Sequence, residues 1–329
     1  MAIYDEIIGH DNIISQLMMA VKFDKVSHAY IFNGPDGSGK SLVAKAFAQS
    51  LLCEKHEEKG CGVCPACRHV QSDSNPDLKY IRHEKPNTIG VDDVREGLVN
   101  DIQLKPYNGL RKVYIIDEAE KLSPQAQNAI LKTIEEPPEY SVIIFLTNNS
   151  EVFLPTIMSR CITFNFRPIR ESVIVDYLIK EYKIADYDAK VCATFSQGLL
   201  GRAIKLVESK SFNEIRDAAI KFVKNVYTYE IYDLVDELKT ISEFKIEITD
   251  FIDIIEMYFR DVLLFKVTKD PNNLIFADEI NAIRKQASKS SYEGIEAILN
   301  SCETAKARIK ANVNFDLAME LMLLSIKEN

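Results

Sequence analysis

The chain has 329 residues, of which 47% are hydrophobic, and a formal net charge of −9. This length is too great for one small core and suits two or three domains. No apolar run approaches the roughly 18 residues of a membrane span, and the first residues lack the pattern of a secretory signal. The acidic charge argues against a free-standing nucleic-acid binder, because such proteins are more often basic. We therefore expect a cytoplasmic protein without a membrane partner, which another protein brings to any nucleic acid.

The first half of the chain alternates strand and helix patterns. Helices are predicted at Ser41–Leu52 and Pro124–Glu135. Short runs rich in β-branched and aromatic residues predict strands. These strands are Ala29–Asn33, Leu78–Arg82, Lys112–Ile116, Val142–Thr147 and Cys161–Phe166. Such alternation predicts a five-stranded parallel sheet covered by helices on both faces.

The strand patterns end after about residue 167, and only helices are expected beyond it. They are predicted at residues 171–182, 188–196, 211–226, 229–240, 246–267, 274–287, 291–310 and 314–327, with one more after Gly201. In the last of these, apolar residues recur at helical spacing, which we interpret as core packing. These residues are Phe315, Ala318, Met319, Met322 and Ile326.

This change of pattern predicts three domains. An α/β domain is expected at residues 1–166, with an insertion at residues 53–67. A small helical domain is expected at residues 167–209 and an all-helical domain at residues 210–329.

A glycine-rich turn follows the first predicted strand. Gly34–Ser41 matches the phosphate-binding pattern G-x-x-x-x-G-K-S/T at every fixed position. Lys40 is expected to contact the β and γ phosphates, and Ser41 to place its hydroxyl on Mg²⁺. A chance match is the alternative, but a strand before the loop and a helix after it argue against it. The candidate nucleotide-binding residues here are Gly34, Gly37, Ser38, Gly39, Lys40 and Ser41.

The predicted strand Lys112–Ile116 ends in two carboxylates, Asp117 and Glu118. In sheets of this type ligands bind beyond the carboxyl ends of the strands. Asp117 is then expected to face the Mg²⁺ held by Ser41, and Glu118 to orient or deprotonate an attacking water. A solvated acidic loop would explain the pair equally well if it stood alone. The phosphate loop upstream favours the functional interpretation.

Polar residues also follow the strand Val142–Thr147. Thr147 or Asn148 is placed to hydrogen-bond a γ-phosphate or the attacking water, and a simple asparagine turn is the alternative. Further on, Arg160 stands between a short helix and the last strand. On its own it is best interpreted as a solvated arginine in a surface salt bridge.

Four of the seven cysteines form a cluster with the spacing Cys53-x₇-Cys61-x₂-Cys64-x₂-Cys67. An odd number of cysteines in a cytosolic chain argues against disulfides. Four thiolates suit a structural, tetrahedral Zn²⁺ site, and an iron–sulfur cluster is the alternative. We therefore predict a metal module inserted after the helix that follows the phosphate loop.

Together these motifs resemble the bacterial clamp-loader family of DNA polymerase III, almost from end to end. Besides the phosphate loop and the cysteines, the blocks that carry the resemblance are Ile7–His10, Ser27–Phe32, Lys112–Pro138, Leu154–Cys161 and the closing helix with Asn312, Asn314 and Phe315–Glu320. The resemblance implies an AAA+ nucleotide-binding domain with a zinc module, then a helical lid domain and a C-terminal collar domain. It also identifies Arg160 as an arginine finger that acts on a neighbouring subunit.

The family includes the hydrolysing gamma/tau motor and the more rigid delta-prime subunit. The lid of the motor carries a γ-phosphate-sensing arginine, and the aligned position here is Gly201. Arg202 lies one residue further on, which turns it by about 100° on a helix. This departure, the stretch Asn75–Leu78 and the chain length resemble the delta-prime branch. We therefore expect binding of ATP or ADP with Mg²⁺, but weak or absent hydrolysis.

The resemblance implies a subunit that joins gamma/tau and delta subunits in a hetero-pentamer through its collar. Arg160 would act at an adjacent gamma/tau site while the assembly loads the sliding clamp onto primed DNA, which this subunit meets only indirectly. One alternative is a gamma/tau motor with a shortened tail, which an intrinsic ATPase would reveal. Two others are a P-loop nucleotide kinase, which needs a pocket of clustered arginines, and a zinc-module nucleic-acid binder, which the acidic charge disfavours.

Overall fold

The computed structural model describes residues 2–81, 88–107, 109–242, 248–271, 274–311 and 313–329. The chain forms two compact units. The first comprises Met1–Arg170 with Gly198–Arg202, and the second comprises Glu171–Gln197 with Ala203–Asn329. The division into three domains at residues 166 and 209 stays a prediction.

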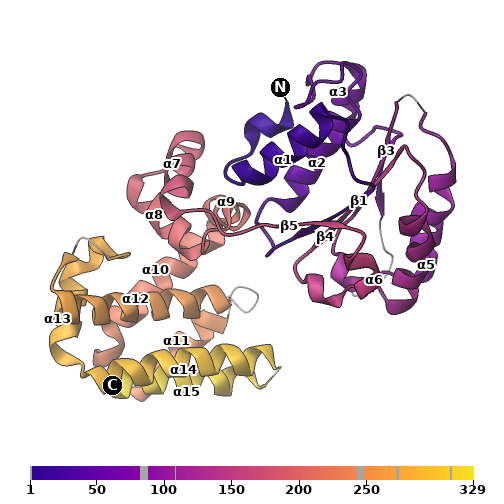
Figure 1. Cartoon of the computed structure of the whole chain (residues 1–329). Coiled ribbons are helices and arrows are strands. Elements are labelled where there is room, and N and C mark those ends of the chain that lie inside the picture. Colours follow the sequence, from indigo (N-terminus) through magenta and orange to yellow (C-terminus); the bar gives the residue numbers. More distant parts are fainter. Residues whose placement is uncertain (1, 82–87, 108, 243–247, 272–273, 312) are drawn as a thin grey trace. The chain divides into compact units, whose positions relative to one another are not determined.

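A five-stranded parallel sheet forms the centre of the first unit (Figure 1). Its strands are β1 (Ala29–Asn33), β2 (Leu78–Ile81), β3 (Lys112–Ile116), β4 (Ser141–Thr147) and β5 (Ile162–Asn165). They lie in the order β2-β3-β4-β1-β5. The predicted strands are confirmed, with ends that agree within one residue. Arg82, predicted at the end of the second strand, lies outside the described residues.

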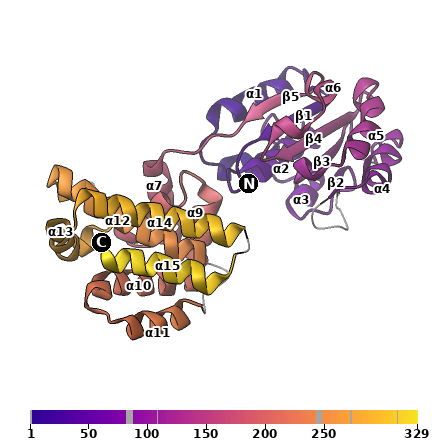
Figure 2. The ribbon, with the colours of Figure 1, turned by 90° about the horizontal axis from the view of Figure 1, so that it is seen from below.

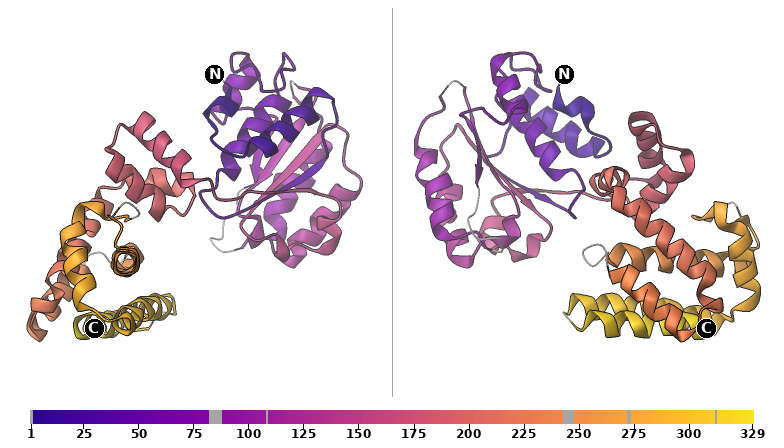
Figure 3. Two further views of the ribbon diagram at one scale, coloured as in Figure 1. Left: turned by 60° about the vertical axis from the view of Figure 1, so that its left-hand side comes forward. Right: turned by 180° about the vertical axis from the view of Figure 1, so that it is seen from behind.

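Helices cover both faces of this sheet (Figures 1 and 3). They are α1 (Asp11–Lys22), α2 (Lys40–Leu51), α3 (Pro65–Gln71), α4 (Val91–Val94), α5 (Pro124–Glu135) and α6 (Pro155–Met158). Successive residues of β1 point to opposite faces, as a strand requires. Tyr30 and Phe32 belong to the core beneath α1 and α2, whereas Ala29 and Ile31 belong to the core beneath α5 and α6. Burial on both faces explains why β1, β3 and β4 read as continuous apolar runs.

The register of the strands brings their carboxyl ends together at one edge. Asn33 at the end of β1 pairs with Thr147 at the end of β4, and Ile116 at the end of β3 pairs with Phe145. The loop after β1 and the acidic residues after β3 therefore emerge on either side of the end of β4.

The second unit is helical in its described residues (Figure 2). Its helices are α7 (Glu171–Tyr182), α8 (Asp186–Phe195), most of α9 (Leu200–Glu208), α10 (Lys210–Asn225), α11 (Ile231–Ser242), α12 (Ile248–Thr268), α13 (Ile280–Lys289), α14 (Tyr292–Lys310) and α15 (Phe315–Glu328). The first two positions of the helix predicted at 246–267 lie outside the described residues. No helix that the structure describes has both the length and the apolar composition needed to cross a membrane.

Helix α12 is the centre of the second unit, because it contacts α10, α13 and α14. Its buried residues, among them Phe251, Ile255 and Phe259, cover about half of its circumference, a wider face than the stripe of about 100° typical of a surface helix. Helix α15 packs beside α14 and α11. The apolar stripe predicted on α15 does pack in the core, where Met319 and Met322 are buried and Phe315 is half-buried at the edge.

The helix predicted at 274–287 is only partly correct. The chain makes a short 3₁₀ turn at Ala277–Glu279, and α13 begins at Ile280. A buried carboxylate explains the late start, because Asp261 of α12 accepts a hydrogen bond of 2.8 Å from the backbone N–H of Phe276. This bond fixes a non-helical turn that apolar periodicity cannot reveal.

Asp261 should make the stability of the protein depend on pH. Burial raises the pKa of this carboxyl to about 6, although the N–H groups of Phe276 and Ile275 and the charge of Arg260 lower it. The folded chain then holds this proton more tightly than the unfolded chain. Its stabilising contribution is complete below about pH 4 and is lost as the pH rises through 6.

We expect Asp261→Asn to remove up to about 3 kcal/mol of pH dependence between pH 4 and 7, since the amide oxygen can still accept the Phe276 hydrogen bond. Urea unfolding at several pH values measures the difference from the unmodified chain. Glu320→Gln, at an exposed position of the same unit, is the control. Parallel stability curves for Asp261→Asn and the unmodified chain would contradict the prediction.

Candidate nucleotide-binding site and cysteine cluster

The glycine-rich loop connects β1 directly to α2. The backbone N–H of Gly34 donates to the carbonyl of Thr147 at 3.0 Å, which fastens the start of the loop to the end of β4. Gly37 has a φ of +79°, a conformation that strains any residue with a side chain. Helix α2 then begins at Lys40, so the N–H groups of its first turn face the loop.

The side chain of Lys40 is buried within this loop. Its ammonium group donates to the carbonyls of Gly34 and Pro35, the second at 3.0 Å, and lies 3.6 Å from a carboxylate oxygen of Asp36. Burial lowers the pKa of Lys40, while Asp36, Glu120 and Asp117 oppose the change. The acidic residues after β3 are thus near enough to act on the charge of the loop lysine.

A buried hydroxyl in the loop has no hydrogen-bond partner within the part of the chain that the structure describes. Ser38 is 3% exposed, and its Oγ is unsatisfied. Such a group is costly unless a ligand or water satisfies it. An acceptor oxygen of a bound phosphate would do so, which fits the chemistry predicted for this loop.

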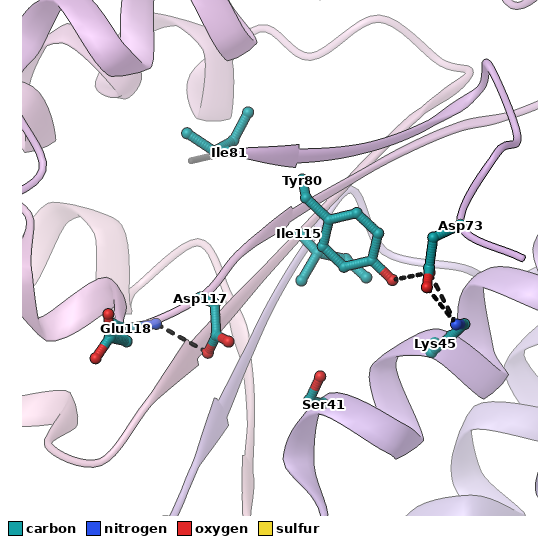
Figure 4. Close-up of a pocket in the computed structure, with 8 residues that line it drawn as sticks. All are labelled: Ser41, Lys45, Asp73, Tyr80, Ile81, Ile115, Asp117 and Glu118. Carbon is teal, nitrogen blue, oxygen red and sulfur yellow. Dashed lines mark hydrogen bonds and ion pairs between the residues drawn. The ribbon is translucent and has the colours of Figure 1, made fainter. Parts of the chain in front are cut away.

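The acid pair after β3 shares a pocket with the start of α2 (Figure 4). The pocket has a volume of about 600 Å³. Asp117 accepts a hydrogen bond of 2.9 Å from the N–H of Glu118, and Glu118 pairs with Lys121 at 2.7 Å. The lining residues are Ser41, Lys45, Asp73, Tyr80, Ile81, Ile115, Asp117 and Glu118. The structure therefore brings together the two segments that were predicted to share a magnesium site.

Glu120 is a residue that the sequence analysis missed. Its carboxylate accepts from the hydroxyl of Thr147 at 3.0 Å and from the N–H of Asn148 at 3.3 Å. It thereby joins the acidic turn after β3 to the end of β4. Thr147 is buried in this contact, whereas the side chain of Asn148 is exposed. Asn148 is therefore the better placed of the two to reach a ligand. In the sequence, the signal that could have identified Glu120 is its position three residues after Asp117.

The N-terminal segment also contacts the loop. Nε2 of His10 lies 2.9 Å from the backbone carbonyl of Ser38, and the His10 ring lies 4.8 Å from that of Phe166. Residues 7–10, one of the blocks that carry the family resemblance, are thus attached to the phosphate loop.

The segment that carries the predicted lid position packs directly on the loop. The N–H of Gly201 donates to the carbonyl of Gly37 at 2.9 Å. A Cβ atom at position 201 would lie 3.0 Å from both Cα and O of Gly37. Because backbone atoms of the loop occupy this space, a side chain at position 201 would require the backbone of one of the two segments to shift.

Arg160 lies just after α6 and is 39% exposed. Its guanidinium pairs with Glu135 at 3.1 Å and donates to the carbonyl of Thr156 at 3.0 Å. Arg160 does not occur among the described residues that line the pocket of its own chain. The surface salt bridge is therefore present, and a role in another subunit stays open to proposal.

The four predicted cysteines converge in space. Their sulfur atoms all lie within 4.8 Å of one another. Four sulfurs on one tetrahedral Zn²⁺ lie ~3.8 Å apart, as Zn–S bonds of about 2.3 Å require. The backbone N–H of Cys61 donates to the sulfur of Cys53 at 3.3 Å, and that of Cys64 donates to the sulfur of Cys61 at 3.3 Å. Burial raises the pKa of Cys61, but the N–H groups of Val63 and Cys64 outweigh it and lower the pKa to about 6.

The cysteine cluster packs on the far end of α2. Cys53 follows that helix by two residues, and Cys64 caps α3 by accepting from the N–H of Cys67. On α2, the amide of Gln49 donates to the carbonyl of Cys67 at 3.3 Å. The donor set and its spacing are compatible with zinc. Helix α3 was not predicted, because seven residues give too little periodicity.

The parallel sheet order, the glycine loop between β1 and α2 and the acidic end of β3 define the AAA+ class of P-loop domains. Two family profiles match the chain: "DNA polymerase III, delta subunit" at residues 9–170, and "DNA polymerase III, delta subunit, C terminal" at residues 212–328. The chain belongs to the family of DNA polymerase III clamp-loader subunits.

The relatives of this chain include two subunits from Bacillus subtilis. The delta′ subunit of DNA polymerase III is 26% identical over 320 residues, which cover 96% of this chain and 95% of that subunit. The tau subunit is 27% identical over 343 residues, and this chain spans 60% of its length. A solved structure of a gamma-subunit-related protein from Thermotoga maritima is 19% identical with a TM-score of 0.48, covering 95% of this chain and 99% of the other.

Proposed function

We propose that this chain is a delta′-type subunit of a clamp loader, which assembles with gamma/tau and delta subunits and helps to load a sliding clamp onto primed DNA. The observation that carries the proposal is the match along nearly the whole delta′ subunit, combined with a pocket that unites Ser41, Asp117 and Glu118. Residues 210–329 would serve as the collar. This role would place the chain in the cytoplasm.

The nucleotide pocket would bind ATP or ADP with Mg²⁺. The loop from Gly34 to Ser41 would hold the phosphates, and Ser41 with Asp117 would hold the metal ion. Glu118 would orient water, and Asn148 would contact the γ-phosphate. A Cβ atom at position 201 would press on the backbone of Gly37, which disfavours a sensing arginine there, so hydrolysis by this subunit would be weak.

The cysteine cluster would hold a structural Zn²⁺ through Cys53, Cys61, Cys64 and Cys67. A closed set of four thiolates leaves no open position for chemistry, so the ion would stabilise the fold. An iron–sulfur cluster needs the same ligands, and elemental analysis of the purified chain distinguishes the two.

Arg160 would act as an arginine finger in the nucleotide site of an adjacent gamma/tau subunit. Its half-exposed guanidinium, held by Glu135, supports this role. In the reconstituted loader, Arg160→Ala should lower DNA-stimulated ATP turnover about a thousandfold at the site it serves, the lower end for arginine fingers. The loader would then retain only the turnover of its other sites.

The matched control is Arg68→Ala, at an exposed arginine on α3. Gel filtration should show that both variants still assemble with their partners. Unchanged turnover in the assembled Arg160→Ala loader would remove the trans-acting role and leave Arg160 as a surface ion pair.

A gamma/tau-type motor is the second candidate, because the tau subunit of Bacillus subtilis also matches 96% of this chain. Reconstitution of the loader from purified subunits distinguishes the motor from the delta′-type subunit. A motor would hydrolyse ATP alone and occupy several positions in the complex, whereas a delta′-type subunit would occupy one and require the others.

A further inference from the structure

The pocket extends beyond the predicted magnesium site to a second group of polar residues (Figure 4). Lys45 of α2 lies 2.8 Å from both carboxylate oxygens of Asp73. The hydroxyl of Tyr80, on β2, donates to Asp73 at 3.2 Å. None of these three residues was singled out by the sequence analysis, and none belongs to the phosphate loop.

Lys45 stands close to the predicted magnesium ligand. It follows Ser41 by four residues on α2, so the two side chains lie on the same face, ~6 Å apart along the helix axis. An unpaired ammonium at this place would repel a divalent cation bound to Ser41 and Asp117. In the structure the ammonium is instead drawn toward Asp73 and the carbonyl of Gln71.

The position of Asp73 depends on the segment that carries the cysteines. Helix α3, which begins after Cys64 and contains Cys67, ends at Gln71. Asp73 follows in a left-handed conformation with a φ of +52°. This turn aims the carboxylate back toward α2, so the segment that follows the cysteine cluster supplies one wall of the pocket.

We propose that Asp73 is a positioning residue of this pocket, which neutralises Lys45 and holds its ammonium away from the bound Mg²⁺. The proposal rests on the proposed binding of magnesium–nucleotide. Asp73 acts through Lys45 and touches neither the nucleotide nor the metal ion. Its loss therefore weakens only the part of the nucleotide affinity that Mg²⁺ contributes.

The test measures ADP affinity by calorimetry, with Mg²⁺ and separately with EDTA. Asp73→Asn keeps an acceptor for Lys45 and Tyr80 but removes the charge. It should weaken binding of Mg–ADP about threefold to tenfold, with a smaller effect at high salt, and should not weaken binding in EDTA, where the freed ammonium attracts the phosphates. The double variant Lys45→Met with Asp73→Asn should restore the affinity for Mg–ADP. Lys55→Met, at an exposed lysine, is the control for loss of a positive charge.

Three outcomes would overturn the proposal while the unmodified chain binds Mg–ADP: equal affinity of Asp73→Asn, equal weakening in EDTA, or no recovery in the double variant. Equal weakening in EDTA would mean that Asp73 only supports the pocket wall. Failure of the unmodified chain to bind Mg–ADP would instead contradict the proposed function itself.

Discussion

Replacement of Lys40 by alanine should weaken binding of Mg–ATP and Mg–ADP by about 100-fold, or about 3 kcal/mol. The ammonium of Lys40 is buried in the loop, where carbonyls of Gly34 and Pro35 hold it ready for an anion. A phosphate in this site would gain a charge-assisted hydrogen bond in surroundings from which water is largely excluded. Titration with a fluorescent ADP analogue measures the loss.

The control for this variant is Lys55→Ala, which removes an exposed lysine of the same unit. Thermal melts of both variants check that the fold persists. If Lys40→Ala is folded and still binds nucleotide with unchanged affinity, the glycine loop is not the phosphate site.

Loss of the proposed Zn²⁺ ion should produce the second large effect. We expect Cys67→Ala to abolish zinc binding and to lower stability by about 4 kcal/mol, the amount for a ligand present at 1,000 times its dissociation constant. The melting temperature of the first unit should then fall by about 10 °C. Cys67 is fully buried, and its backbone carbonyl accepts a hydrogen bond from Gln49 of α2. Unfolding of the cysteine cluster would therefore also remove a contact of the helix that follows the phosphate loop.

A buried cysteine outside the cluster supplies the matched control. Cys302→Ala in α14 makes the same substitution at a fully buried position and should cost only about 1 kcal/mol of packing, without change in metal content. Equal destabilisation by the two variants, or zinc retained at full occupancy in Cys67→Ala, would contradict a four-cysteine site.

Local patterns were sufficient for the strands and for identifying the glycine-rich loop, the acid pair and the cysteine cluster as candidate sites. Gly34–Ser41 could be predicted as a phosphate loop because that motif needs certain residue types at fixed spacing. The cysteine cluster could be predicted for the same reason, since its four candidate ligands lie within 15 residues. The inner strands β1, β3 and β4 could be predicted because burial on both faces leaves continuous apolar runs.

The contacts around the sites could not be predicted in this way, because they join residues that are distant in the sequence. Glu120 reaches the end of β4, 27 residues further on, and Lys45 reaches Asp73 across 28 residues. The 3₁₀ turn before α13 depends on Asp261 in another helix. Neither the spacing of apolar residues nor a sequence motif indicates such long-range pairs.

The sequence by itself determined which chemistry this protein carries: a phosphate loop, an acid pair after a buried strand and four thiols at metal-binding spacing. Only the tertiary structure decided how these parts are held. The strand order placed Asp117 in one pocket with Ser41, and packing between distant segments brought Gly201 against Gly37 of the loop. The physical reason is that residue types set chemistry locally, whereas packing between distant segments sets the distances at which that chemistry acts.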